Sequence, residues 1–251
     1  MFSGIVIIAV TVATVLVVYF GARRLLRGDV ESETRDLAAS ILFRVAALHG
    51  LVLALVFASE IVEYHQLGLE SAMEANAISD VSYDMVRYGS GQVDAVRDAL
   101  RRYLEVASTE EWESLGRDGV LHSQGWASWE TAYQIILDLE PSNARQQALR
   151  DNMLDKIHAI AENRDLREYH ARSGLSALFW AAALVGVVLV AAGYYTFPPK
   201  RHNLILLTFF GAYTGFILFT IYAMSNPFSA PAALEPELFR DLLVELLPAD
   251  G

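Results

Sequence analysis

Four apolar stretches interrupt this chain of 251 residues, two before and two after a long polar segment. Each has about the 20 residues that a helix needs to cross a hydrocarbon core of roughly 30 Å. The polar segment is too charged to enter a bilayer, so the pattern predicts a multi-pass membrane protein. The apolar stretches cover residues 2–20, 41–62, 175–196 and 204–224.

This pattern divides the chain into four predicted parts. Transmembrane helices 1 and 2 lie in residues 1–62, a helical extramembrane domain in 63–173, transmembrane helices 3 and 4 in 174–226, and a C-terminal amphipathic segment in 227–251.

The polar segment has helical periodicity and no strand alternation, so the predicted fold class is all-α. The second span continues into it without a proline, which predicts one helix from about Asp36 to Tyr88 that ends at Gly89-Ser90-Gly91. Further helices are predicted at residues 93–107, at 126–139, from an N-cap at Ser142 towards the third span, and at 238–247.

Composition excludes several classes of function. The net charge of -11 argues against nucleic acid as a partner, because nucleic acid recruits lysine and arginine clusters. The chain has no cysteine, which excludes disulfides and thiolate sites. None of the common hydrolase, phosphate-binding or dinucleotide motifs is present. We therefore predict no enzyme activity, no cofactor and no metal site.

The charges that flank the spans predict an orientation in the cell membrane. Arg23 and Arg24 follow the first span, and Lys200 and Arg201 separate the third from the fourth. Positive charge in short loops marks the cytoplasmic side. The extramembrane domain and both termini are therefore predicted to be extracytoplasmic.

The helix of the second span carries the most specific candidate chemistry. On a helical wheel, four of its carboxylates fall within an arc of about 80°. Ionisable groups within a span are costly, and they tend to face a partner or a water-filled path. The four carboxylates are Glu60, Glu63, Glu70 and Glu74, and the same face continues into the membrane through Val56, Leu53 and His49.

Repeated around an oligomer axis, this face would line a pore. Glu60 and Glu63 would form carboxylate rings, which favour cations, and Val56 and Leu53 an apolar constriction above a ring of His49. Glu70 and Glu74 would extend an acidic ladder that attracts cations. The alternative is a solvated face whose carboxylates pair with arginines of neighbouring helices, namely Arg87, Arg97, Arg101 or Arg102.

The fourth span contains a small-residue motif, Gly211 to Gly215, that lets two helices approach closely. We expect it to pack against the third span, which has Gly186 and Gly193. A contact between subunits is the alternative.

Several short stretches, taken in order, resemble the DUF4239 family of bestrophin-like membrane proteins. They are Glu74-Ala75-Asn76-Ala77, the stretch from Tyr103 to Glu111-Trp112, Arg164 to Arg172 before Phe179-Trp180, and Asn226-Pro227-Phe228-Ser229.

The resemblance implies a polytopic membrane protein with four transmembrane helices in a 2+2 arrangement around a helical extramembrane domain. It also implies a homo-oligomeric ion channel, a pentamer in bestrophins proper, whose partners are the lipid bilayer, copies of itself and inorganic ions, and whose second span lines the pore. Bestrophins keep their soluble part in the cytoplasm, whereas the loop charges here predict the opposite side.

Two departures from the bestrophin pattern bear on selectivity. The second span has no aromatic triad, only Phe57, and no acidic calcium-binding loop is evident. The acidic face therefore favours cations over anions. The alternative function is a non-conducting membrane scaffold or sensor whose extramembrane domain binds a partner or ligand.

Overall fold

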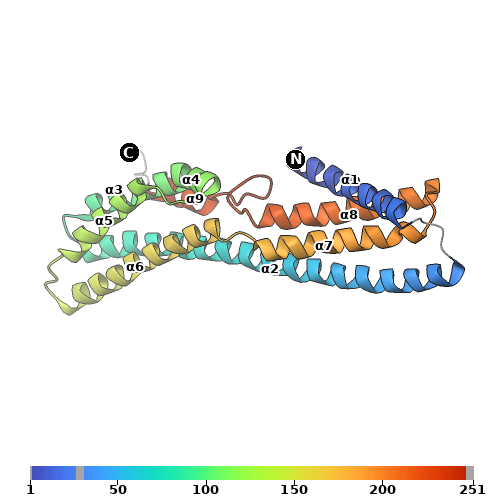
Figure 1. Cartoon of the computed structure of the whole chain (residues 1–251). Helices are drawn as coiled ribbons and strands as arrows, with labels where there is room; N and C mark the ends of the chain where they lie inside the picture. The colour runs from blue at the N-terminus through green and yellow to red at the C-terminus, as the bar shows by residue number, and fades with distance from the viewer. Residues whose placement is uncertain (1, 27–30, 247–251) are drawn as a thin grey trace. The chain divides into compact units, whose positions relative to one another are not determined.

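The computed structural model describes residues 2–26 and 31–246, and every regular element in them is helical (Figure 1). The all-α prediction is confirmed. The elements are α1 (Phe2–Leu25), α2 (Ser32–Tyr88), α3 (Val93–Val106), the π-helix η1 (Ala107–Glu111), α4 (Trp112–Asp118), α5 (Ser123–Leu137), α6 (Ala144–Arg172), α7 (Ala177–Gly193), the 3₁₀-helix η2 (Tyr194–Thr196), α8 (Arg201–Met224) and α9 (Glu237–Leu246).

Four helical segments are long and apolar enough to cross a membrane. They are α1, α2, the segment Ala144–Thr196 that contains α7, and α8. They match the four apolar stretches of the sequence, and α2 runs without interruption from its apolar half into its polar half, as predicted.

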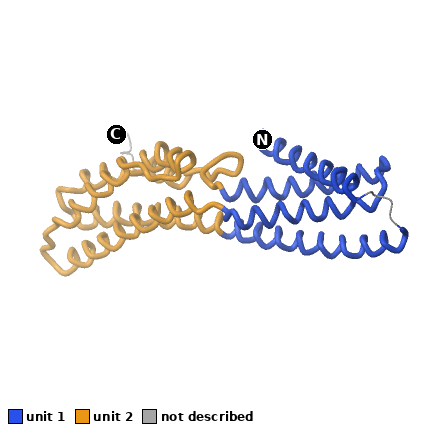
Figure 2. The backbone as a smooth tube through the Cα atoms, in the orientation of Figure 1, with its two compact units in different colours: residues 1–62, 175–225 blue, residues 63–174, 226–251 orange. Residues whose placement is uncertain are grey.

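The chain forms two compact units (Figure 2). The first contains residues 1–62 and 175–225, and the second contains residues 63–174 and 226–251. Each unit has a hydrophobic core of its own.

In the first unit, α1 packs along α8 and α7. Glycine makes the approach of α1 to α8 possible, because a Cβ on Gly211 would lie 3.0 Å from the Cα of Val12, and one on Gly215 would lie 2.9 Å from the Cα of Ile8. The motif therefore packs within the chain against the first span, not against the third as we expected. Gly186 and Gly193 of the third span instead approach side chains of α2.

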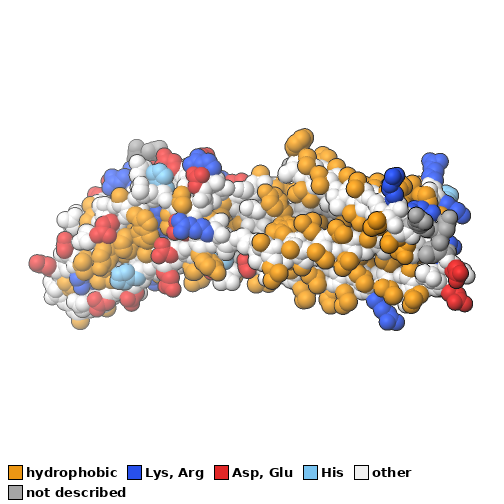
Figure 3. Space-filling view, viewed as in Figure 1, with side chains coloured by type: hydrophobic (Ala, Val, Ile, Leu, Met, Phe, Trp, Pro, Cys, Tyr) orange, Lys and Arg blue, Asp and Glu red, His pale blue; other side chains and the backbone are white. Residues whose placement is uncertain are grey.

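The outside of the first unit is apolar. Figure 3 shows hydrophobic side chains gathered over it, whereas charged side chains are frequent on the second unit. Phe2, Leu51 and Leu178, for example, are more than half exposed. Such a surface suits lipid or neighbouring subunits better than water.

The second unit combines the polar half of α2 with α3, η1, α4, α5, α6 and α9. Gly89 and Gly119 follow the ends of α2 and α4, and both have positive φ. Glycine adopts this left-handed backbone conformation more readily than other residues, because it has no Cβ. The core of the second unit includes Leu67, Ile78, Met85, Leu100, Tyr103, Met153, Ile157 and Phe239.

Helix boundaries in this unit differ slightly from the predicted ones. Helix α5 begins at Ser123, before the predicted start at Trp126. The N-cap of α6 is Asn143, whose side-chain oxygen accepts a hydrogen bond from the Gln146 backbone N–H at 3.0 Å. Ser142, the predicted cap, donates instead to the Gln146 side chain. Helix α9 was predicted to reach Leu247, which lies outside the described residues.

Candidate functional site

The face of α2 predicted to line a pore is turned mostly towards the chain's own helices. His49, Leu53 and Glu60 are at most 8% exposed. Val56 is half-buried against the core of the first unit, and only Glu63 is exposed. Of the predicted pore residues, three are therefore buried in the chain's interior, Val56 is half-buried and Glu63 is exposed.

The surroundings of His49 explain its burial. Its imidazole lies directly against Gly186 of α7, where any side chain would collide with it. One turn further along α2, Leu53 belongs to the core that also contains Ala183 and Val187 of α7. The missing side chain at Gly186 thus lets α2 bring a histidine into an apolar helix contact.

A neighbouring face of α2, about 100° around the helix from the first, is exposed and almost entirely apolar. Its side chains follow one another at intervals of four and three residues, the spacing of one helix face. They are Leu48, Val52, Leu55, Ser59 and Val62.

Beyond the membrane part, Glu70 and Glu74 are buried in the second unit. Glu70 Oε2 lies 3.1 Å from His170 Nε2 of α6. Glu74 is fully buried and pairs with Arg167, which also belongs to α6. Neither pairs with the arginines proposed from the sequence, of which Arg87 and Arg101 have partners on their own helices.

Glu74 belongs to a charged network in the interior of the second unit. Arg167 donates to it through Nε and Nη2, both at 2.9 Å, and the Tyr103 hydroxyl donates to the same carboxylate. Arg167 Nη2 also lies 3.1 Å from Glu111 Oε1. Arg164 donates to both oxygens of Glu111, with Nε 3.1 Å from Oε1.

Backbone and glycine geometry complete this network. The backbone N–H of His122 donates to Glu111 Oε2 at 3.0 Å, while its carbonyl accepts from Arg164 Nη2 at 2.8 Å. A Cβ on Gly125 would lie 2.5 Å from that same Nη2. Glycine at the start of α5 therefore leaves the space in which the guanidinium group sits.

Aromatic rings cover the two guanidinium groups. The Cζ of Arg167 lies 5.7 Å from the ring centre of Trp112 and 5.2 Å from that of Phe239, while Arg164 lies 4.3 Å from Trp126. Cation–π contacts gain strength when water is excluded. Through Phe239 the network also holds α9 in place.

Two carboxylates face two guanidinium groups, so the network is electrically balanced. Burial by itself lowers the pKa of Arg167, but Glu74, Tyr103 and Glu111 outweigh it and raise that pKa above its ordinary value. Burial raises the pKa of Glu74, and Arg167 offsets part of that rise. Burial and the Glu74 carboxylate raise the pKa of Tyr103 well above 10.0, so its hydroxyl remains a donor.

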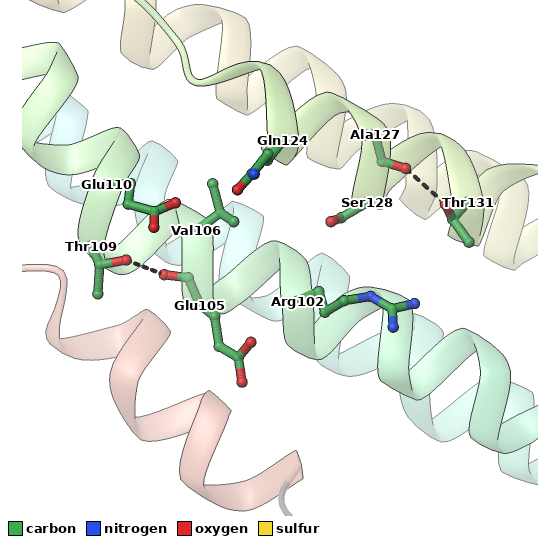
Figure 4. A pocket seen from close by; sticks show the side chains of 9 residues that line it. All are labelled: Arg102, Glu105, Val106, Thr109, Glu110, Gln124, Ala127, Ser128 and Thr131. Atoms are coloured by element: carbon green, nitrogen blue, oxygen red, sulfur yellow. Dashed lines mark hydrogen bonds between the residues drawn. The ribbon is translucent and has the colours of Figure 1, made fainter.

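A groove of about 580 Å³ lies on the surface of the second unit, between α5 on one side and α3 with η1 on the other (Figure 4). Its lining is mostly polar. It includes Arg102, Glu105, Val106 and Glu110 from the first wall and Gln124 and Ser128 from the second. No pattern in the sequence predicted this groove.

Comparison with known proteins points to one family. A model of the bestrophin-like domain matches residues 9–239. A bacterial bestrophin homologue from Klebsiella pneumoniae, crystallised as a single-substitution variant, has a similar fold, with a TM-score of 0.68 and 11% identity over 97% of this chain and 99% of that one.

A second variant of the Klebsiella pneumoniae homologue gives a TM-score of 0.61 with 15% identity over 97% of both chains. No curated protein matches the sequence. At these identities the structures show likeness of fold, and the family rests on the domain match.

Proposed function

This chain belongs to the bestrophin-like family, and we propose from that premise that it forms a homo-oligomeric ion channel, with five subunits as the expected number, in which α2 lines the pore. The observation that carries the proposal is the exposed face of α2 within its membrane part. The other membrane helices of the first unit also expose apolar side chains, which suit lipid. For α2 we favour a central axis, because the family is one of channels.

In this proposal the outer face of α2 forms the pore. Rings of Leu48, Val52, Leu55 and Val62 would make a narrow apolar neck, and such constrictions gate by dewetting. His49 and Leu53 lie behind the pore and pack against α7, and Glu60 is buried on the same face.

Glu63 is the carboxylate best placed to select ions. It is exposed and follows Ser59 by one helical turn, at the end of the apolar face. A ring of Glu63 would attract cations at the mouth of the neck. We therefore propose that the channel prefers cations over anions. The sequence predicted carboxylate rings of both Glu60 and Glu63, and the proposal keeps only the ring of Glu63.

Paired substitutions in the purified full chain, reconstituted in planar bilayers, test this proposal. Glu63→Gln is expected to shift the reversal potential in a KCl gradient towards the anion equilibrium potential, whereas Glu60→Gln leaves it in place. Leu55→Ala is expected to raise conductance, with Leu53→Ala as the control on the inner face.

The opposite pattern, with effects at Glu60 and Leu53 only, would place the inner face on the axis. A monomer by native mass spectrometry, without current, would remove the channel proposal altogether.

A further inference from the structure

The groove between α3 and α5 has a charge at each end. Figure 4 shows Arg102 at one end and Glu110 at the other, with the Ser128 side chain reaching into the space between them. Neither Arg102 nor Glu110 has an ion-pair partner among residues 2–26 and 31–246. The third charged group of the lining, Glu105, is held by Arg101 at 3.0 Å.

The π-helix η1 explains why Glu110 faces the groove. At Ala107–Glu111, directly after α3, the backbone hydrogen bonds span five residues instead of four, which rotates the following side chains relative to a regular α-helix. Glu111 is thereby buried in the charged network while its neighbour Glu110 stays exposed. Isolated π-helical turns occur frequently at functional sites.

The groups along the middle of the groove suit an amide backbone. The Gln124 amide and the Ser128 hydroxyl have no hydrogen-bond partner among the described residues, whereas the hydroxyls of Thr109 and Thr131 donate to backbone carbonyls of their own helices. Val106 provides an apolar surface beside them. A ligand with donors, acceptors and small apolar groups would find partners here.

We infer that this groove binds a short zwitterionic peptide, with its carboxylate at Arg102 and its ammonium group at Glu110. The two residues are eight positions apart, which is about 12 Å along a helix. An extended chain spans roughly 3.3–3.6 Å per residue, so a tripeptide has the matching length. Single amino acids are too short to reach both ends.

The position of the groove gives such a ligand a route to α2. Glu110 is joined by one peptide bond to Glu111, which binds Arg164 and Arg167, and Arg167 binds Glu74 of α2. Binding is nevertheless a separate property from conduction. Peptide binding is measured without a current. The binding inference can therefore be wrong while the chain conducts ions, and it can be right if the chain does not conduct.

Isothermal titration calorimetry of the full chain in detergent tests the inference, with trialanine as the probe. N-acetyl-trialanine amide, which has the same length and no terminal charges, is the matched control. Because hydrogen bonds to charged groups contribute more than neutral ones, loss of either end is expected to weaken binding about tenfold or more.

Four variants locate the site. Arg102→Gln and Glu110→Gln are each expected to weaken trialanine binding about tenfold. Arg145→Gln and Glu113→Gln, both at exposed charged residues outside the lining, are expected to leave it unchanged.

Equal affinity for the capped peptide would overturn the inference, as would unchanged binding in Arg102→Gln. Absence of heat for trialanine at millimolar concentration would do the same, provided that the thermal unfolding of the sample is normal.

Discussion

Arg167 of α6 donates two hydrogen bonds of 2.9 Å to Glu74 of α2, and both side chains are completely buried. The pair joins two helices whose residues lie 93 positions apart in the chain. Removal of one partner leaves the other as a buried charge without compensation, which costs far more than the pair itself contributes. The network is therefore sensitive to single substitutions.

Arg167→Met is expected to destabilise the protein by about 3–5 kcal/mol, because it leaves Glu74 without its guanidinium and Glu111 with only one. Arg101→Gln, which breaks a partly exposed pair with Glu105 on the same helix, should cost less than about 1 kcal/mol. Thermal unfolding of detergent-purified variants, followed by tryptophan fluorescence, measures both. Similar melting temperatures for the two variants would contradict the buried role of Arg167.

The ionisation of Tyr103 is expected to make the free energy of unfolding decrease with pH in the alkaline range. Its pKa in the folded protein is raised well above 10.0 by burial and by Glu74. The unfolded chain therefore releases this proton first as pH rises, so the contribution is complete below pH 10 and declines above it. Relative to Tyr103→Phe, which cannot titrate, the wild type is expected to lose up to about 1.4 kcal/mol per pH unit above 10.

Melting temperatures of both proteins between pH 8 and about pH 11 measure this difference. The other tyrosines titrate in both proteins and cancel in the comparison. A constant difference across this range would show that Tyr103 ionises alike in the folded and unfolded states.

Gly215→Ala tests the contact of α8 with α1. The new Cβ would lie 2.9 Å from the Cα of Ile8, and backbone cannot move aside as a flexible side chain can, so a loss of about 1–3 kcal/mol is expected. Gly21→Ala on α1 meets no atom within 4 Å and should be neutral or slightly stabilising, because alanine favours helix. The melting temperatures of the two variants are compared by heating the samples and measuring the remaining folded protein by size-exclusion chromatography. Equal melting temperatures would mean that α1 and α8 do not approach this closely.

The membrane helices could be predicted from sequence because the length of an apolar run directly fixes its ability to cross a bilayer. The continuity of α2 followed from the absence of proline between Asp36 and Tyr88. The boundary at Asn143 and the π-helix could not be predicted, since both depend on local hydrogen bonds that several neighbouring residues are able to make.

The charged network was missed although the sequence contains a signal for it. On α6, Met153, Ile157, Ile160, Arg164 and Arg167 follow one another at intervals of four and three residues, so the two arginines continue the apolar face. Glu74 lies in the same way between Leu67 and Ile78 on α2. A charge in the middle of an apolar face predicts a buried partner, but only the tertiary structure shows which one.

The face of α2 that contains His49 and Glu60 illustrates the limit of this reasoning. A helical wheel groups the residues correctly, but it does not tell an oligomer axis from the protomer's own interior. Gly186, 137 positions after His49, decides the matter by leaving room for the imidazole.

Cysteine labelling tests the orientation predicted from the loop charges. The natural chain has no cysteine, so a single introduced thiol reports one position only. Ala148→Cys lies at an exposed site on α6, and Lys200→Cys lies at an exposed site between the third and fourth spans. In intact cells, a membrane-impermeant maleimide is expected to label Ala148→Cys and to reach Lys200→Cys only after the membrane is opened. The reverse pattern would place the extramembrane domain in the cytoplasm, as in bestrophins, and would mean that Arg23, Arg24, Lys200 and Arg201 do not determine topology in this chain.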